Sequence, residues 1–285
     1  MNIQRSETRI PKIIHYCWFG GNPLPPQLKE CVDSWKKLEG YQIIEWNESN
    51  CSFDENEFVR RAYKEKKFAF ISDFYRLKGI YEYGGIYLDT DVKVFRDFEP
   101  LLNYPVFLNF IFECAVGSAV IGAEPKSQFI KNLLQMYENT VFVQKNDNTN
   151  GKIFDQRDGN LYVNEYVTNN YYFTYYILKH YPHFKLNNKF QNLGDFVIYP
   201  KEYFEIGSLL NRQYTIHYCA GVWRVKNDSR KTLKNSIKRI LMKNPWIYEK
   251  TQILIRKRRY SKLNKKIPFY AYYLAQKKGE NLPEL

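Results

Sequence analysis

The chain reads Gly84-Gly85-Ile86-Tyr87-Leu88-Asp89-Thr90-Asp91-Val92 in its first third, and this stretch predicts both a strand and a site. A glycine pair precedes a short apolar run, and two carboxylates separated by one residue follow as the strand ends. A loop that follows a buried strand projects its side chains into the cleft at the sheet edge. Hard cations such as Mg²⁺ and Mn²⁺ prefer carboxylate oxygens together with substrate phosphate oxygens. The stretch therefore predicts a cation site that serves a phosphorylated substrate.

Strand-like and helix-like segments alternate on both sides of this stretch. Besides the strand that ends at Asp89, apolar runs bounded by turn residues predict further strands. These lie at 13–18, 41–46, 106–112, 120–122, 196–199 and 214–218. Helical periodicity predicts helices from Pro25-Pro26 to Gly40, around Phe58 and Ala62 with Asp54 as the cap, and at 68–83, 125–138 and 164–180. This alternation predicts an α/β domain with a mostly parallel sheet, whose ligands bind where strand ends meet loops.

Composition describes an ordinary globular chain. Its 285 residues are 44% apolar and 26% charged, enough for one enlarged domain or two unequal ones. No run approaches the roughly 18 apolar residues of a membrane-spanning helix, and residues 1–9 lack the apolar centre of a secretory signal. Five cysteines without a Cys-x-x-Cys pair suggest neither a disulfide framework nor a zinc site. We therefore expect a cytoplasmic location.

The net charge of +13 is concentrated at the C-terminus. Residues 224–285 carry 18 Lys or Arg against 4 Asp or Glu, so residues 1–223 are almost neutral. The spacing of Leu233, Ile237, Ile240 and Leu241 among basic residues predicts an amphipathic helix, and a second basic stretch covers 256–266. We therefore divide the chain into a domain at 1–223 and a basic, mainly helical extension at 224–285.

Three explanations of this basic extension remain open. It binds an anionic membrane surface, which would place the protein peripherally on the inner face of the plasma membrane, or it is a solvated helical appendage packed on the domain. Nucleic-acid binding is the least favoured, because no recognised module accompanies the charge.

Several further residues are candidates for a nucleotide-sugar cleft. Asp73 and Arg76 share one helix face and suit sugar hydroxyls and phosphates, although an ordinary intrahelical ion pair explains the spacing equally well. Trp18, at the end of the first strand, is either a core aromatic or a platform for a nucleobase. His217 is either a structural histidine or a further ligand of the cation. The chain lacks the P-loop, dinucleotide-binding and hydrolase-elbow motifs, which removes those classes.

Three segments together resemble a known family. They are 10–21, which reads Ile-Pro-Lys-Ile-Ile-His-Tyr-Cys-Trp-Phe-Gly-Gly, then 69–76 with Ser72-Asp73 and Arg76, then 83–91 with Asp89-Thr90-Asp91. In this order they are similar to the DXD-containing glycosyltransferases of family 32, which include bacterial capsule and lipopolysaccharide sugar transferases and the yeast initiating mannosyltransferase. The core of that family is similar to the glucosyltransferase domain of large clostridial toxins. The resemblance covers about residues 10–223 and leaves the basic extension outside it.

This resemblance implies a GT-A-like fold and a role for each matching residue. Trp18 would stack on the donor base, and Asp73 and Arg76 would hold the sugar, with Arg76 also near the phosphates. Asp89 would bind ribose and sugar hydroxyls and touch the metal through water, and Asp91 would ligate Mn²⁺ or Mg²⁺ directly.

One further segment extends the comparison to the end of the domain. In related bacterial sequences a histidine precedes a terminal Ser-x-Trp segment, and residues 216–223 occupy that place, with Ala220-Gly221 where a serine is often found. The resemblance thus implies His217 as a metal ligand and Trp223 as a residue that closes the cleft over the donor.

The resemblance implies a metal-dependent hexosyltransferase that takes a sugar from a UDP- or GDP-linked donor, with retention, for surface polysaccharide synthesis. The acceptor would be a glycan hydroxyl, and the basic extension suggests that it is lipid-linked. Two alternatives stay open. A haloacid-dehalogenase-type phosphotransferase also uses Asp-x-Asp after a strand, but Lys93 stands where that class expects Thr or Val. A basic membrane or nucleic-acid adaptor without activity is the other.

Overall fold

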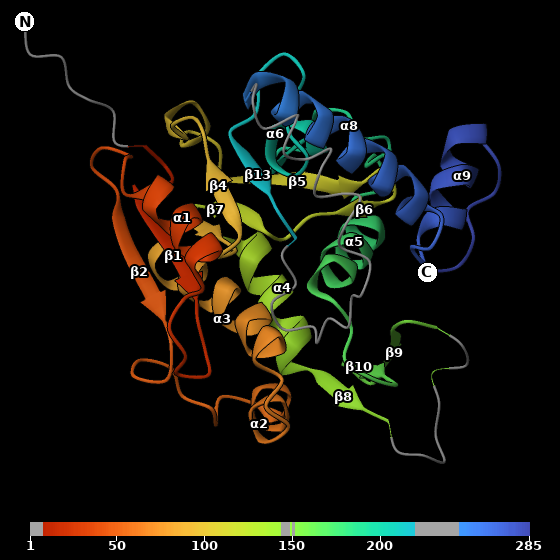
Figure 1. Ribbon diagram of the computed structural model, residues 1–285. Coiled ribbons are helices and arrows are strands. Elements are labelled where there is room, and N and C mark those ends of the chain that lie inside the picture. The colour runs from red at the N-terminus through yellow and green to blue at the C-terminus, as the bar shows by residue number, and fades with distance from the viewer. Residues whose placement is uncertain (1–7, 144–148, 150–151, 220–244) are drawn as a thin grey trace, which may run out of the picture.

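A central mixed sheet organises the molecule (Figure 1). The computed structural model describes residues 8–143, 149, 152–219 and 245–285. Eight strands form this sheet in the order β11-β12-β5-β7-β3-β1-β2, with β6 paired to β5. Their bounds are β1 Ile13–Cys17, β2 Gln42–Trp46, β3 Gly85–Leu88, β5 Val106–Phe112, β6 Ala115–Val116, β7 Val120–Ala123, β11 Gln191–Asn192 and β12 Val197–Tyr199.

The sheet is mostly parallel, as predicted. Strand β1 pairs in parallel with β2 and β3, and β12 pairs in parallel with β5. Strand β7 is antiparallel to both β3 and β5, so β3 and β5 run in the same direction as each other. Strand β11 is antiparallel to β12, and β6 is antiparallel to β5. The carboxyl ends of β1 and β3 therefore meet at one edge of the sheet, where ligands of α/β domains gather.

Helices cover both faces of the sheet. On one face lie α2 (Glu57–Lys64), α3 (Phe68–Tyr83), α4 (Gln128–Glu138) and α5 (Asn169–His180), which share one apolar cluster with the sheet. On the other face α1 (Pro26–Trp35) and α6 (Lys201–Phe204) build a second cluster around Trp35, Phe107 and Phe204. Neighbouring residues of one strand serve opposite clusters, as Ile86 and Tyr87 do.

Two small sheets complete the fold. Strand β4 (Val92–Val94) pairs antiparallel with β13 (Thr215–His217), and β10 (Asn160–Val163) joins β8 (Thr140–Phe142) to β9 (Asp155–Arg157). A short 3₁₀ helix, η1 (Glu99–Leu101), follows β4.

Two predicted helix starts are wrong. Asn56, and not Asp54, caps α2, because its side chain accepts the Val59 N–H while Asp54 accepts from Arg60. Helix α5 begins at Asn169 and not near residue 164, because residues 160–163 form β10.

The turn from α3 into β3 admits only glycine at two successive positions. Gly84 has φ +65° and Gly85 has φ +108°, which side chains rarely adopt. A Cβ atom on Gly85 would lie 2.5 Å from the Ile13 carbonyl oxygen, and one on Gly84 would lie 2.7 Å from a Pro125 carbon. This pair stops α3 and starts the strand that carries the two carboxylates.

A buried histidine fastens this turn to β1 and β2. His15 Nε2 donates to the Gly84 carbonyl at 2.8 Å, and its Nδ1 accepts from Trp46 Nε1 at 3.2 Å. Burial lowers the pKa of His15 to about 4, because the charged ring would lose its hydration. The imidazole is therefore neutral at physiological pH, with its proton on Nε2.

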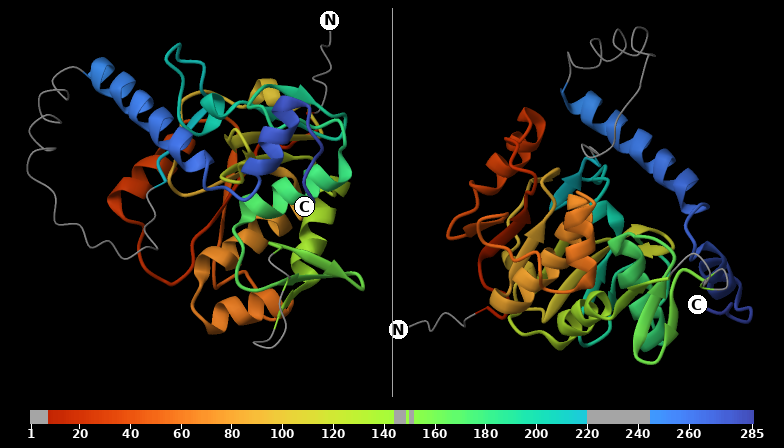
Figure 2. Two further views of the ribbon diagram at one scale, coloured as in Figure 1. Left: turned by 90° about the vertical axis from the view of Figure 1, so that its right-hand side faces the viewer. Right: turned by 90° about the horizontal axis from the view of Figure 1, so that it is seen from below.

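The C-terminal helices pack on the domain. Helix α8 (Pro245–Asn264) runs along one side of the molecule, and α9 (Tyr270–Lys278) lies beyond its end (Figure 2). Asn264 Oδ1 accepts the Cys114 N–H at 3.2 Å, and Phe269 and Tyr272 join the larger apolar cluster. The predicted amphipathic helix at 233–241 lies outside the described residues, as does Trp223. Among the described helices, none has the length and apolar character needed to cross a bilayer.

The His15 contacts predict an acid-sensitive contribution to stability. Below about pH 6.5 the ring is protonated in the unfolded chain but stays neutral in the folded chain until about pH 4, so this ring alone lowers the free energy of unfolding by about 3 kcal/mol between pH 6.5 and 4. Urea unfolding of His15→Gln should show lower stability at pH 7 and a smaller loss of stability than the wild type between pH 6.5 and 4. The exposed His183→Gln serves as the control and should keep the wild-type slope. Equal slopes in all three proteins would refute the assignment.

Candidate functional site

The Asp-x-Asp segment lies at the carboxyl end of β3. The Asp89 N–H donates to the Ala119 carbonyl at 2.9 Å, which continues the pairing of β3 with β7, and the Val92 N–H then donates to the Asp89 carbonyl. The Asp89 side chain is 25% exposed, whereas that of Asp91 is 4% exposed. Asp89 is thus the more accessible of the two carboxylates, and Asp91 points into the protein.

The pairing of β4 with β13 brings His217 to Asp91. Val92 is the register partner of His217, and the Tyr218 N–H donates to the Asp91 carbonyl at 3.0 Å. His217 Nε2 lies 3.2 Å from Asp91 Oδ1. One ligand atom from each of Asp89, Asp91 and His217 lies within 4.8 Å of the other two. The structure therefore gathers all three residues that the sequence nominated for the metal.

Arg76 is a buried cation that joins α3 to this edge. Its Nη2 donates to Asp73 Oδ1 at 2.7 Å, and its Nη1 donates to the Ser118 carbonyl at 2.8 Å and lies 3.2 Å from Asp89 Oδ1. The guanidinium also lies 4.6 Å from the centre of the Tyr87 ring, whose hydroxyl donates to Asp89 Oδ1 at 2.9 Å. The pair of Asp73 and Arg76 is buried, so it is no ordinary surface ion pair.

Asp73 is buried together with Arg76. Burial raises the pKa of its carboxyl to about 6 although the neighbouring Arg76 opposes the shift. Its backbone carbonyl accepts from Asn169 Nδ2 at 3.2 Å, at the start of α5, so α3 and α5 are tied together beside the site.

Trp18 lies at the same sheet edge and is half-buried. Its backbone N–H donates to the Trp46 carbonyl, and its indole Nε1 donates to the Asn22 carbonyl at 2.5 Å. The side chain packs against the second apolar cluster but is not enclosed by it. Part of the Trp18 side chain therefore stays accessible at the sheet edge where the family resemblance places the nucleotide-sugar donor.

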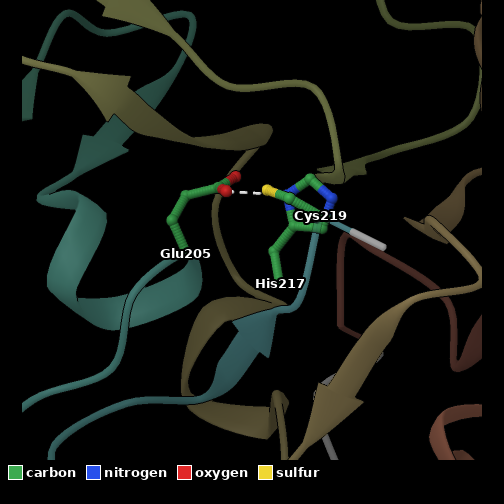
Figure 3. Close-up of side chains that lie close together, drawn as sticks. All are labelled: Glu205, His217 and Cys219. Carbon is green, nitrogen blue, oxygen red and sulfur yellow. Dashed lines mark hydrogen bonds and ion pairs between the residues drawn. The ribbon is translucent and has the colours of Figure 1, made fainter. Parts of the chain in front are cut away.

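The other nitrogen of His217 contacts a buried carboxylate that the sequence did not single out. Glu205 Oε2 lies 2.8 Å from His217 Nδ1, and Glu205 Oε1 accepts from Asn109 Nδ2 at 3.1 Å. Figure 3 shows this carboxylate directed at the imidazole, with the Cys219 thiol beside it. Burial by itself lowers the pKa of His217, but the negative groups around the ring outweigh that effect and raise the pKa well above its usual value.

The donor set fits a divalent cation. Two carboxylates and one imidazole suit Mn²⁺, and the carboxylates alone also suit Mg²⁺. A carboxylate on the remote nitrogen is the usual partner of a metal-bound histidine, because it fixes the ring orientation. Glu205 provides that partner. It escaped the sequence analysis because a glutamate after a short helix carries no motif.

A family model matches the part of the chain that contains the second and third of the three segments. Residues 25–108 match the family model "Glycosyltransferase sugar-binding region containing DXD motif". This range contains Asp73, Arg76, Asp89 and Asp91 but ends before His217 and Glu205.

Two curated yeast proteins are similar to the chain. "Inositol phosphoceramide mannosyltransferase 3" of Schizosaccharomyces pombe is 30% identical over 142 residues, which cover 46% of this chain and 37% of that protein. "Mannosyl phosphorylinositol ceramide synthase CSH1" of Saccharomyces cerevisiae is 28% identical over 138 residues, which cover 44% and 35%. The chain thus spans little more than a third of the length of these relatives.

Among solved structures, "PaToxG Glycosyltransferase" aligns with a TM-score of 0.38 and 19% identity, covering 46% of this chain and 61% of that one. The family model matches the strand, the helix and both carboxylates from which the site is built. Residues 25–108 of the chain therefore resemble the glycosyltransferase sugar-binding region that carries the DXD motif.

Proposed function

We propose that this protein is a metal-dependent glycosyltransferase that moves a sugar from a nucleoside-diphosphate donor to a hydroxyl group. The convergence of Asp89, Asp91 and His217 on one point carries the proposal. Two of them belong to the matched region, and the third reaches them through the β4–β13 pairing. Such a ligand set leaves coordination positions for diphosphate oxygens, as Mn²⁺ and Mg²⁺ sites usually do.

Each group has a defined task in this proposal. A bound metal supplies charge that stabilises the departing nucleoside diphosphate. Asp91 and His217 would hold the metal, and Asp89 would bind it directly or through water and would also bind the ribose and sugar hydroxyls of the donor. Trp18 offers its accessible surface to the base. Trp223 remains a proposed cleft-closing residue at the donor, although it lies outside the described residues.

Arg76 takes a positioning role besides its predicted contact with the donor. Its guanidinium donates to the carbonyls of Ser72 and Ser118 and to the Asp73 carboxylate, and its contact with Asp89 holds that second carboxylate in place. A fixed positive charge in a region of low dielectric also favours the negative charge that develops on a leaving diphosphate. Arg76 and Asp73 would together orient the sugar, because their hydrogen bond and the contact of Arg76 with Asp89 are already formed.

The donor and acceptor are proposed at the level of their class. The donor carries UDP or GDP, and the acceptor is a glycan or a lipid-linked oligosaccharide in surface polysaccharide synthesis, such as capsule or lipopolysaccharide. The names of the two yeast relatives, which refer to mannose and to a phosphate-bearing lipid, support a hexose and a lipid-type acceptor. We further propose transfer with retention, and a cytoplasmic location at the inner face of the plasma membrane through the basic residues of 224–285.

Removal of one ligand charge tests the metal site. Asp91→Asn should weaken Mn²⁺-dependent binding of UDP and GDP by more than about tenfold and abolish transfer, because the amide is a poorer ligand for a hard cation. Titration calorimetry with and without Mn²⁺ measures the effect. Asp158→Asn makes the same change on an exposed turn with positive φ, where asparagine is well tolerated, and should leave binding unaltered. Unaltered nucleotide binding by Asp91→Asn would refute the proposal.

The Glu205 contact predicts a second variant with a milder effect. Glu205→Gln keeps the shape but removes the charge behind His217, so the affinity for Mn²⁺ should fall about ten- to hundredfold. The bound fraction can be followed by the electron paramagnetic resonance signal of free Mn²⁺, with Asp91 intact. Glu202→Gln, on the short helix α6 that ends just before Glu205, is the matched control and should bind Mn²⁺ as the wild type does. If both variants behave alike, Glu205 has no positioning role.

A further inference from the structure

A second cavity adjoins the candidate metal site on the side of the basic C-terminal helix. It has a volume of about 480 Å³ and lies between β4, β13 and α8. Three cationic side chains line it, Lys93 from β4 and Arg256 and Arg259 from α8. The described lining contains no carboxylate. This cavity is therefore a basic recess built from segments that are far apart in the sequence.

The residues of α8 that line the recess fall on one helix face. Gln252, Ile255, Arg256 and Arg259 recur at the spacing of i, i+3, i+4 and i+7, and Tyr260 continues the row. Lys257 and Arg258 lie between them in sequence, are exposed and do not line the cavity. Two of the four consecutive cations at 256–259 thus face the recess, while the other two face solvent.

Two of the three lining cations lie near aromatic rings. The Arg256 guanidinium lies 5.0 Å from the centre of the Tyr218 ring, and Lys93 Nζ lies 5.9 Å from that of Phe95. Within the described part of the chain, no salt bridge joins Lys93, Arg256 or Arg259 to a carboxylate. Positive charges gathered in a recess whose described lining contains no carboxylate favour an anionic ligand. Arginine forks suit phosphate oxygens in particular.

The recess meets the metal site at one residue. His217 lines the cavity, and Lys93 follows Asp91 by two positions. Trp18, Asp73, Arg76 and Asp89 do not line it. An anion held here would lie next to the metal ligands but away from the residues proposed for the base and the sugar of the donor.

Large apolar side chains with accessible surface also line the recess. Phe95 is 42% exposed, Tyr218 is 41% exposed and Ile255 is 55% exposed, although all three are large apolar side chains. Cations beside accessible apolar groups match a ligand that carries a phosphate next to hydrocarbon.

We propose that this recess, formed by Lys93, Arg256 and Arg259, binds a phosphate group of the acceptor and that the adjoining apolar side chains contact its hydrocarbon. The inference rests on the proposed function, since only a sugar transfer at the metal gives the recess an acceptor to hold. A phosphate bound beside His217 positions the acceptor hydroxyl near the donor, and the C-terminal helix thereby becomes part of the acceptor site.

Binding of dodecyl phosphate below its micelle concentration tests the recess, with dodecyl maltoside as the uncharged amphiphile. We expect wild-type protein to bind the phosphate preferentially in titration calorimetry. Arg256→Gln/Arg259→Gln should weaken this binding at least about tenfold, because two charge-assisted contacts are lost. Lys257→Gln/Arg258→Gln removes the same charge from the same helix and should leave binding within about twofold of wild type, since exposed charges outside the recess act only weakly. Lys93→Gln, on β4, gives an independent variant and should also weaken binding.

Nucleotide binding separates acceptor from donor phosphate. UDP or GDP with Mn²⁺ should bind the Arg256→Gln/Arg259→Gln protein as it binds the wild type and should not displace dodecyl phosphate. Displacement, or an equal loss of nucleotide affinity, would assign the recess to the donor diphosphate and overturn the proposal. Equal losses in the two double variants would also overturn it, because general attraction to α8 would then explain the binding. Failure of wild-type protein to bind any nucleotide with Mn²⁺ would instead contradict the proposed glycosyltransferase function, so the two failures are distinguishable.

Discussion

The register between β4 and β13 is the constraint on which the site depends. It places His217 opposite Val92 and therefore beside Asp91, across a sequence separation that no local pattern spans. Because side chains alternate between the two faces of a strand, a slip of one residue would turn His217 away from the carboxylates. The Tyr218 hydrogen bond to the Asp91 carbonyl and the buried contact of His217 with Glu205 both fix this register.

Each of the two cationic side chains near this pairing contacts two carboxylates. Asp73 and Asp89 share the buried Arg76, while Asp91 and Glu205 flank His217 on its two nitrogens. Buried charges of one sign are costly unless partners of the other sign surround them. In the proposed enzyme a divalent cation would replace the proton on His217 Nε2 and add positive charge beside the carboxylates, so the site would be a preformed frame of fixed charges. A frame of this kind needs little reorganisation when negative charge shifts to a leaving group.

Local chemistry made much of the fold predictable. Helix α3 has the predicted bounds because a glycine pair ends it, and the parallel arrangement followed from the alternation of strands and helices. The family match over residues 25–108 favours the glycosyltransferase interpretation of the Asp-x-Asp segment over the phosphotransferase one. Long-range partners were not predictable in this way. Glu205 and Ser118 reach the site only through packing, and Asn56 displaced Asp54 as a cap because two plausible caps stand close together in the sequence.

The pairing of β4 with β13 also has a consequence for the synthesis of the protein. Asp89 and Asp91 leave the ribosome before Glu205 and His217, which follow after more than a hundred further residues, at about 5 to 20 residues per second. A nascent chain that ends between these two groups therefore carries two carboxylates without their imidazole. The ligand set is complete only once β13 has been synthesised, and a translation product that stops before this strand is unable to assemble it.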